Sequence, residues 1–232
     1  MLVVITGASQ GIGYAVAEAF AAEGHTLCIC SKTAARLKEA TESLAKKYAT
    51  ATIHSMQADL AKSEDCKTFG SWSLSFGTPT ILINNAGFFL PGNLMQEEQG
   101  ILESQIAANL YSAYHTSRAI VPAMIKAGSG HIFNICSIAS LQAYTQGGSY
   151  SISKYALDGF SKNLREELKD KGIKVTGVYP GATYTNSWAG SGVEPSRIME
   201  SNDIATMIVA ASKLSPQAVV EDIVMRPLFG DL

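Results

Sequence analysis

The chain has 232 residues, of which 47% are hydrophobic and only 16% are charged, and its net charge is -2 at pH 7. This composition suits one compact domain with a large buried core, so we expect a single domain over residues 1–232. No long run of one charge sign is present, so nucleic acid and strongly anionic membrane surfaces are not expected as partners.

The N-terminal segment 1–7 has neither the basic region nor the cleavage site of a signal peptide, and its apolar run is too short to span a membrane. The four cysteines and four histidines show no CxxC motif and no cluster at metal-ligand spacing. We therefore expect a cytoplasmic protein with reduced thiols, no membrane segment and no metal site.

Apolar runs alternate with amphipathic segments along the chain, which predicts alternating strands and helices. Strands are expected at 3–6, 26–30, 51–57, 81–84, 131–136, 174–179 and 219–225, and helices at 14–23, 34–47, 63–76, 99–127, 149–170 and 202–213. Pro122 is expected to kink the long helical region or to start a new turn in it. The repeated β-α units argue for a seven-stranded parallel sheet with helices on both faces, an α/β fold.

A glycine-rich turn lies between the first predicted strand and the first predicted helix. It reads Thr6-Gly7-Ala8-Ser9-Gln10-Gly11-Ile12-Gly13, with the spacing G-x-x-x-G-x-G. Glycines let the backbone approach a phosphate closely, and a helix start presents free N–H groups and a positive dipole end to an anion. The turn therefore predicts a nucleotide site that includes Gly7, Ser9, Gln10, Gly11, Ile12 and Gly13.

The end of the second predicted strand indicates which dinucleotide binds. In dinucleotide-binding units this position touches the adenosine ribose, where a carboxylate suits a free 2′-hydroxyl and a cation suits a 2′-phosphate. Ser31 and Lys32 stand here, Arg36 follows one helical turn later, and no Asp or Glu lies between Cys28 and Lys38. This favours NADP(H) over NAD(H), with the alternative that Lys32 is an ordinary surface residue.

A phenol and an ammonium group lie four residues apart near the start of the predicted helix 149–170. This spacing places Tyr150 and Lys154 on one helix face. A fixed positive charge near a phenol lowers its pKa, so the pair predicts a proton donor and acceptor near neutral pH. The alternative for the same spacing is a half-buried tyrosine beside a solvated lysine.

These segments together resemble the short-chain dehydrogenase/reductase family along the whole chain. The matching segments are the glycine-rich turn 6–13, Asp59-Leu60, Asn84-Asn85-Ala86-Gly87, Asn109, Ser137, Tyr150-x-x-x-Lys154 and Pro180-Gly181-x-x-x-Thr185. The resemblance implies a single-domain, doubly wound Rossmann fold and a catalytic tetrad of Asn109, Ser137, Tyr150 and Lys154.

The resemblance also implies a role for each member of the tetrad. Tyr150 would protonate the carbonyl oxygen during reduction, and Ser137 would donate a hydrogen bond to the same oxygen. Lys154 would lower the pKa of the tyrosine and hydrogen-bond the nicotinamide ribose, and Asn109 would hold a water for proton relay.

Further residues at the strand ends are expected to border the cofactor or the substrate. The expected cofactor contacts beyond the glycine-rich turn are Ser31, Lys32, Asp59, Leu60, Asn85, Ala86, Gly87, Tyr150, Lys154, Pro180, Gly181, Thr183 and Thr185. The candidates for an apolar substrate pocket are Phe88, Ser137, Ile138, Tyr144, Tyr150, Tyr184 and Trp188, and the segment 186–201 is expected to be a mobile lid.

Three functions are compatible with these residues. The first is an NADP-dependent carbonyl reductase, because the segment 219–231, with Ser31 and Lys32, looks similar to bacterial sepiapterin-reductase-like members of the family. The second is a 3-oxoacyl-[acyl-carrier-protein] reductase, which needs a basic docking surface; Arg118, Lys126, Lys162 and Arg165 are candidates for it. The third, a nucleotide-sensing protein without catalysis, is disfavoured by the complete tetrad.

Members of the family commonly pair through two long helices. Their counterparts in this chain are the predicted helices 99–127 and 149–170. A homodimer or homotetramer that acts on a small-molecule carbonyl substrate is therefore expected.

Overall fold

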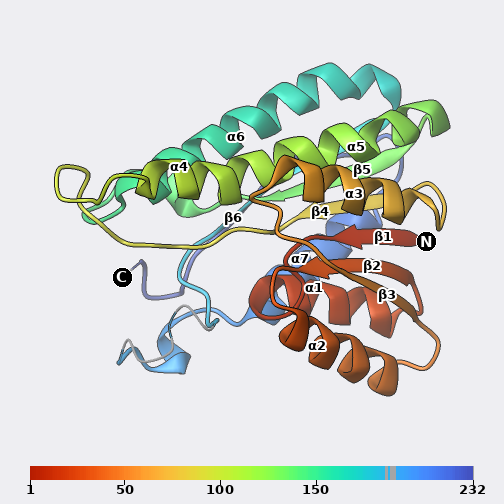
Figure 1. Ribbon diagram of the computed structural model, residues 1–232, viewed down its shortest axis with the longest axis horizontal. Helices are drawn as coiled ribbons and strands as arrows, with labels where there is room; N and C mark the ends of the chain where they lie inside the picture. The colour runs from red at the N-terminus through yellow and green to blue at the C-terminus, as the bar shows by residue number, and fades with distance from the viewer. Residues whose placement is uncertain (186–187, 189–191, 232) are drawn as a thin grey trace.

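The computed structural model describes residues 1–185, 188 and 192–231. Within these residues the chain forms a seven-stranded sheet in the order β3-β2-β1-β4-β5-β6-β7, and every neighbouring pair of strands is parallel (Figure 1). The strands are β1 (Leu2–Ile5), β2 (Thr26–Ser31), β3 (Thr52–Gln57), β4 (Ile81–Asn84), β5 (Gly130–Ile135), β6 (Ile173–Pro180) and β7 (Asp222–Met225). The predicted α/β fold with a seven-stranded parallel sheet is confirmed.

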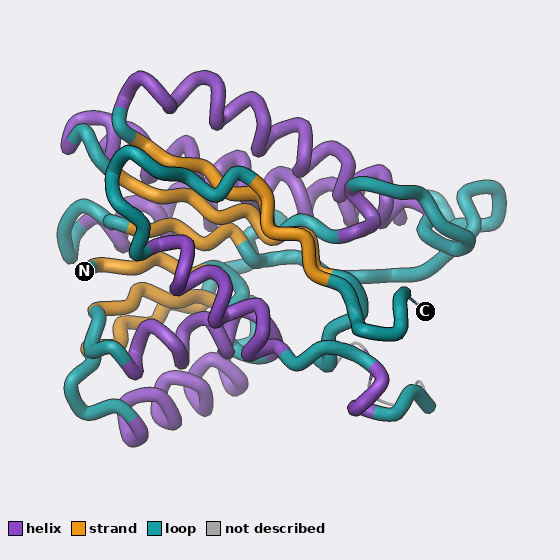
Figure 2. Tube along the Cα trace, turned by 180° about the vertical axis from the view of Figure 1, so that it is seen from behind, coloured by secondary structure: helices purple, strands orange, loops and turns teal. Residues whose placement is uncertain are grey.

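Helices cover both faces of the sheet (Figures 1 and 2). One face carries α1 (Gly11–Ala22), α2 (Ala34–Lys47) and α7 (Ser201–Ser212), and the other carries α3 (Ser63–Leu74), α4 (Ile101–Ile106), α5 (Ser112–Ala127) and α6 (Gly148–Leu168). The central strand β1 contributes side chains to the hydrophobic core on each face of the sheet. Val3 and Ile5 pack with residues of α1 and α7, whereas Leu2 and Val4 pack with residues of α3 and α5. Because successive side chains of a strand point to opposite faces, an entirely apolar strand fits a sheet covered on both sides.

The long helical region expected at 99–127 is interrupted at a different place from the one the sequence indicates. The helix begins at Ile101, and a π turn at Ala107–Tyr111 separates α4 from α5. α5 continues through Pro122, because burial of Val121 and Met124 in the core holds the helix around the missing N–H group. The irregularity therefore falls on the turn that contains Asn109, and π turns are frequent at functional sites.

The C-terminal part of the fold also differs from expectation. The last strand is Asp222–Met225, shorter than the expected 219–225, and before it the carbonyl oxygen of Val220 accepts a hydrogen bond from the Thr176 hydroxyl at 2.6 Å. Residues 186, 187 and 189–191 of the expected lid lie outside the described residues. The later part of that segment is tied to the chain after β6 by a parallel bridge between Thr183 and Met199.

The four cysteines are free and buried. No helix in the described part of the chain is both long enough and apolar enough to cross a membrane. Among the same residues, no group of His, Cys, Asp and Glu side chains is arranged to hold a metal ion.

Candidate active site

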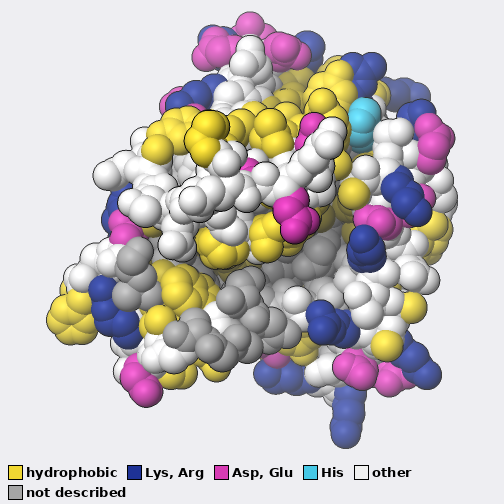
Figure 3. Space-filling view, turned by 60° about the vertical axis from the view of Figure 1, so that its left-hand side comes forward, with side chains coloured by type: hydrophobic (Ala, Val, Ile, Leu, Met, Phe, Trp, Pro, Cys, Tyr) yellow, Lys and Arg dark blue, Asp and Glu magenta, His cyan; other side chains and the backbone are white. Residues whose placement is uncertain are grey.

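A cavity of about 460 Å³ opens at the carboxyl ends of β1, β4, β5 and β6, the edge at which parallel sheets bind ligands. Hydrophobic side chains border this hollowed side of the molecule (Figure 3). The expected cofactor and catalytic residues that line the cavity are Gly7, Gln10, Gly11, Ile12, Asn85, Ala86, Gly87, Ser137, Tyr150, Lys154, Pro180, Gly181, Thr183 and Thr185. Phe88, Ile138, Tyr144 and Trp188, expected at the substrate, line it as well.

The glycine-rich turn forms one wall of the cavity. Gly7 and Gly11 have φ angles of 64° and 58°, which favour glycine. A Cβ atom at Gly13 would overlap the Asn85 amide nitrogen and the Gly7 carbonyl oxygen. Asn85 donates to the carbonyl oxygens of Thr6 and Gly7, both at 3.0 Å, and α1 begins at Gly11. Glycine backbone at a helix start fits the pyrophosphate of a dinucleotide.

A second group of expected cofactor residues lies at the ends of β2 and β3, outside the lining of this cavity. The Ser9 and Ser31 hydroxyl groups are hydrogen-bonded at 2.8 Å, which links the glycine-rich turn to the end of β2. Lys32 Nζ lies 3.1 Å from Asp59 Oδ2, and the lysine side chain is 75% exposed. Such an exposed ion pair contributes at most about 1 kcal/mol, so Lys32 can re-pair with a phosphate at little cost.

Leu60 differs from its expected role. Its side chain is buried in the core with those of Cys66 and Phe69, so only its backbone could face a ligand. The second cation near the end of β2, Arg36, donates a hydrogen bond to Gln10 Oε1 at 3.2 Å and so lies beside the glycine-rich turn.

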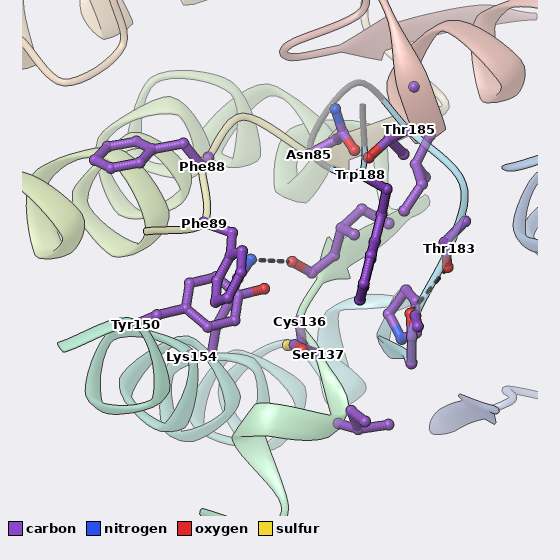
Figure 4. Close-up of a pocket in the computed structure, with 18 of the residues that line it drawn as sticks. Asn85, Phe88, Phe89, Cys136, Ser137, Tyr150, Lys154, Thr183, Thr185 and Trp188 are labelled. Carbon is purple, nitrogen blue, oxygen red and sulfur yellow. Dashed lines mark hydrogen bonds between the residues drawn. The ribbon is translucent and has the colours of Figure 1, made fainter. Parts of the chain in front are cut away.

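The first two turns of α6 bring the phenol and the ammonium group into the cavity (Figure 4). Lys154 Nζ donates to the Ile135 carbonyl oxygen at 2.8 Å and lies 5.8 Å from the centroid of the Tyr150 ring. Ser137 follows β5 and accepts a hydrogen bond from the Ala139 N–H at 3.1 Å. This contact uses the hydroxyl oxygen of Ser137, so its proton remains able to donate.

Burial sets the ionisation of the pair. Desolvation raises the pKa of Tyr150 to about 12, opposed by the hydrogen bond with Ser137, which lowers it. Desolvation also lowers the pKa of Lys154 to about 8. The expectation that Lys154 would bring the phenol pKa below its ordinary value is therefore wrong: loss of solvent outweighs a lysine that is directed at the Ile135 carbonyl. At neutral pH the phenol is protonated and the lysine is mostly charged.

Asn109 is fully buried in the π turn and makes three side-chain hydrogen bonds. Its amide accepts from the Phe88 N–H at 2.9 Å, donates to the Phe88 carbonyl at 3.1 Å and donates to Ser153 Oγ at 2.8 Å. Ser153 Oγ in turn donates to the Tyr150 carbonyl at 2.7 Å. These contacts occupy the Asn109 side chain with protein partners, so they point to a positioning role for that side chain.

Two of the expected substrate-pocket residues behave differently from the others. The Tyr184 side chain is 47% exposed and is not among the described residues that line the cavity. The Tyr184 N–H donates to the Met199 carbonyl at 2.7 Å, and this bridge fixes the segment with the side chain outward. Phe88 borders the cavity, but its ring points away from Tyr150 in Figure 4.

Phe89 is a lining residue that no motif indicates. Its ring meets that of Tyr150 edge to face, with 4.8 Å between the ring centroids and an interplanar angle of 75° (Figure 4). Which of two adjacent phenylalanines faces the phenol depends on how the loop after β4 is held, and the sequence carries no signal for that.

The tail after β7 also supplies lining residues that the motifs miss. Arg226 and Asp231 border the cavity and form an ion pair with each other. The tail lies over Gly181, whose N–H donates to the Met225 carbonyl at 2.7 Å. Arg197 secures the tail by donating to the carbonyls of Phe229 and Gly230. The position of Arg226 directly after a parallel strand is a signal that places it at the ligand-binding edge.

Comparison with known proteins agrees with this architecture. The family model described as short chain dehydrogenase matches residues 1–194. The chain is 31% identical over 240 residues to the sepiapterin reductase of Chlorobaculum tepidum, with 100% of this chain and 98% of that protein covered.

Two solved structures are similar along nearly their whole length. The alcohol dehydrogenase from the archaeon Thermococcus sibiricus, complexed with 5-hydroxy-NADP, has a TM-score of 0.91 and 25% identity, with 98% of this chain and 97% of that chain covered. The L-sorbose reductase from Gluconobacter frateurii, complexed with NADPH and L-sorbose, has a TM-score of 0.89 and 27% identity, with 97% and 94% covered. With a family model spanning well over half of its length, the chain belongs to the short-chain dehydrogenase/reductase family of oxidoreductases.

Proposed function

We propose that the chain is an NADPH-dependent reductase that transfers a hydride to the carbonyl group of a small ketone or aldehyde. The observation that carries the proposal is that Ser137, Tyr150 and Lys154 line one cavity together with the glycine-rich turn. NADPH supplies the hydride when it is bound, and the residues of the chain supply orientation and a proton.

Each residue has a distinct task in the proposed reaction. Tyr150 donates its phenol proton to the carbonyl oxygen of the substrate, and its raised pKa of about 12 keeps that proton in place at neutral pH before the reaction. Ser137 donates a hydrogen bond to the same oxygen, where negative charge develops as the hydride arrives. The charged Lys154 stabilises the phenolate that Tyr150 leaves behind.

The preference for NADPH rests on the cations at the end of β2. Lys32 and Arg36 could both reach a 2′-phosphate placed beside Ser31, and Asp59 is already paired with Lys32. The alcohol dehydrogenase of T. sibiricus and the L-sorbose reductase of G. frateurii hold 5-hydroxy-NADP and NADPH, respectively, which supports the same preference.

The substrate end of the cavity favours a carbonyl on a planar or aromatic group. Phe89, Tyr144 and Trp188 border it, and aromatic side chains pack well against planar rings. The similarity to the sepiapterin reductase of C. tepidum supports a carbonyl beside a pteridine-like ring as a test compound. A cytoplasmic location is part of the proposal and is compatible with the four free cysteines.

Two other functions are less well supported by the geometry. A 3-oxoacyl-[acyl-carrier-protein] reductase needs cations near the entrance, but Arg118, Lys126, Lys162 and Arg165 are not among the described residues that line the cavity. Lys162 is paired with Asp158 and Arg165 with Asp222. A nucleotide sensor without catalysis would have no use for Tyr150 as a proton donor.

The direct test is NADPH oxidation by the purified protein with a panel of carbonyls. The panel includes simple ketones and aldehydes, aryl α-diketones, a pteridine side-chain diketone and acetoacetyl thioesters. We expect turnover of a ketone or aldehyde that is lost in Tyr150→Phe, while NADPH binding to that variant is unchanged. Absence of turnover with the whole panel, or full activity of Tyr150→Phe, would count against the proposal. Preference for the thioesters would favour the acyl-carrier function.

The role of Lys32 gives a separate prediction. Lys32→Ala should weaken NADPH binding by about tenfold, the effect of one charge-assisted hydrogen bond, and should leave NADH binding nearly unchanged. Lys38→Ala is the matched control, because Lys38 lies nearby on α2, which follows Lys32 in the chain, and pairs with Glu42. Dissociation constants from fluorescence titration check the prediction, and an equal loss for both dinucleotides would contradict it.

A further inference from the structure

The first turn of α6, which carries Tyr150, is capped by a side chain from a distant loop. The residue before the helix, Gly147, has no side chain to accept the N–H groups of that turn. The Glu97 carboxylate instead accepts hydrogen bonds from the Ser149 N–H, at 2.9 Å, and from the Ser149 hydroxyl. Side-chain acceptors at a helix start stabilise N–H groups that lack an intrahelical partner. Glu97 therefore holds the residue directly before Tyr150.

The approach of Glu97 to α6 is close enough to require glycine. Gly148 has a φ angle of 43°, and a Cβ atom there would overlap Glu97 Oε1 and lie 2.5 Å from the Gly92 carbonyl oxygen. The Gly92 N–H donates to the Gln146 carbonyl at 2.9 Å. The loop after β4 is thus joined at Gly92 to the segment before α6 and at Glu97 to the first turn of α6.

The same loop also covers the phenol. Its start is held at Phe88 by the amide of Asn109, and its later part is held by Glu97. Phe89 lies between these two attachments, with its ring against that of Tyr150 (Figure 4). A loop secured on both sides of Phe89 keeps the aromatic contact in one geometry.

We propose that Glu97 is a positioning residue for carbonyl reduction: it orients the Tyr150 phenol by capping α6 and by holding the loop that carries Phe89. This inference rests on the proposed function, since the orientation of the phenol matters where it transfers a proton. A misplacement of about 1 Å in a catalytic group can lower a rate by about 100-fold. Acceptance of hydrogen bonds is the property needed at position 97, and an amide oxygen also provides it.

Three variants separate this role from a general effect on the loop. Glu97→Ala should lower kcat by about 10- to 100-fold and leave NADPH binding unchanged, because the glycine-rich turn is untouched. Glu97→Gln should recover most of kcat. Glu98→Ala, which makes the same charge change at the exposed neighbouring residue, should behave as the unaltered protein. The probe is NADPH oxidation with 1-phenyl-1,2-propanedione, analysed for kcat and KM separately.

A second readout does not depend on turnover. Amide hydrogen exchange of residues 147–152 should become faster in Glu97→Ala and stay unchanged in Glu98→Ala. Unchanged kcat and exchange in Glu97→Ala, or equal losses in Glu98→Ala, would overturn the inference, and so would failure of Glu97→Gln to recover activity. Tyr150→Phe distinguishes the two proposals: full activity in that variant overturns the proposed function, whereas an inactive Tyr150→Phe with an unaffected Glu97→Ala overturns only the role of Glu97.

Discussion

Tyr150 and Lys154 have pKa shifts of opposite direction with one cause, the loss of solvent around both groups. Burial raises the pKa of the phenol and lowers that of the ammonium group, and in both cases it favours the neutral form. The lysine is the group whose charge changes within an accessible pH range.

The rate of reduction should therefore fall as the pH rises through about 8. Below that pH Lys154 is charged and stabilises the phenolate formed when Tyr150 gives up its proton; above it the lysine is neutral and that stabilisation is lost. Tyr150 itself stays protonated up to about pH 12 and does not limit the rate in this range. A profile of kcat/KM against pH, which reports on the free enzyme, checks the prediction. The ordinary lysine pKa is about 10, so a profile that stays flat up to about pH 10 would contradict the lowered pKa of Lys154.

The sequence motifs indicated some residues of the cavity and missed others. The spacing of Tyr150 and Lys154 indicated that the two lie on one helix face, and the family resemblance added Ser137, which lines the same cavity. Phe89 and Asp231 were not found, because they line the cavity through loop conformations that depend on distant contacts such as those of Arg197 with the tail. Arg226 was missed although its place directly after the last strand is a usable signal.

At the scale of helices, α1 and α6 each contain one glycine beyond their first residue, and the two glycines, Gly13 and Gly159, have opposite surroundings. A Cβ atom at Gly13 in α1 would overlap Asn85 and the backbone of Gly7. At Gly159 in α6, a Cβ atom would meet no described atom within 4 Å, leaving aside the nearby backbone of its own helix. The first glycine is required by a close approach between elements, and the second is not.

Alanine at the two positions should therefore act in opposite directions. Gly13→Ala should destabilise the fold and weaken NADPH binding at least about tenfold, since it displaces the glycine-rich turn from Asn85. Gly159→Ala should raise the free energy of unfolding by about 0.5–1 kcal/mol, the propensity gain of alanine in a helix. Thermal unfolding with and without NADPH measures both effects. Normal NADPH binding by Gly13→Ala would show that the close approach is not needed.

At the scale of the whole molecule, an apolar surface is exposed on the helices that cover one face of the sheet. The exposed hydrophobic residues of α4, the π turn, α5 and α6 are Leu102, Tyr111, Tyr114, Ile125, Ile152 and Tyr155. We propose that this surface pairs two copies of the chain. Large apolar patches on soluble proteins commonly mark such interfaces.

Tyr155→Glu should therefore convert an assembled form into a single chain. The added carboxylate would have to be buried in the interface, which is strongly unfavourable. Met207→Glu, on α7 at the opposite face of the sheet, should leave at least the dimer intact. Light scattering coupled to gel filtration measures both masses, and a monomeric unaltered protein would contradict the proposal.

The parallel sheet with helices on both faces could be predicted because apolar and amphipathic segments alternate along the chain. The order of the strands was not predicted from this alternation. Local deviations from regular helices could not be predicted. Pro122 indicated a break that the buried face of α5 overrides, and nothing in the sequence around Asn109 indicated a π turn. Deviations of this kind are decided by packing between elements, which a single-sequence pattern does not contain.

Because of the π turn at Ala107–Tyr111, the position of Asn109 depends on the number of residues in this helical region as well as on their types. The turn accommodates one residue more than an α-helix would, and α4 packs on α6 whereas α5 packs on α3. Deleting a single residue from the turn would allow a regular helix and would leave α4 and α5 close to their present rotation about the common axis, because the wide turn takes up the extra residue. It would remove the widened turn from which the Asn109 amide reaches Phe88. A deletion that improves local helix regularity should thus preserve the sheet, as circular dichroism would show, and abolish turnover.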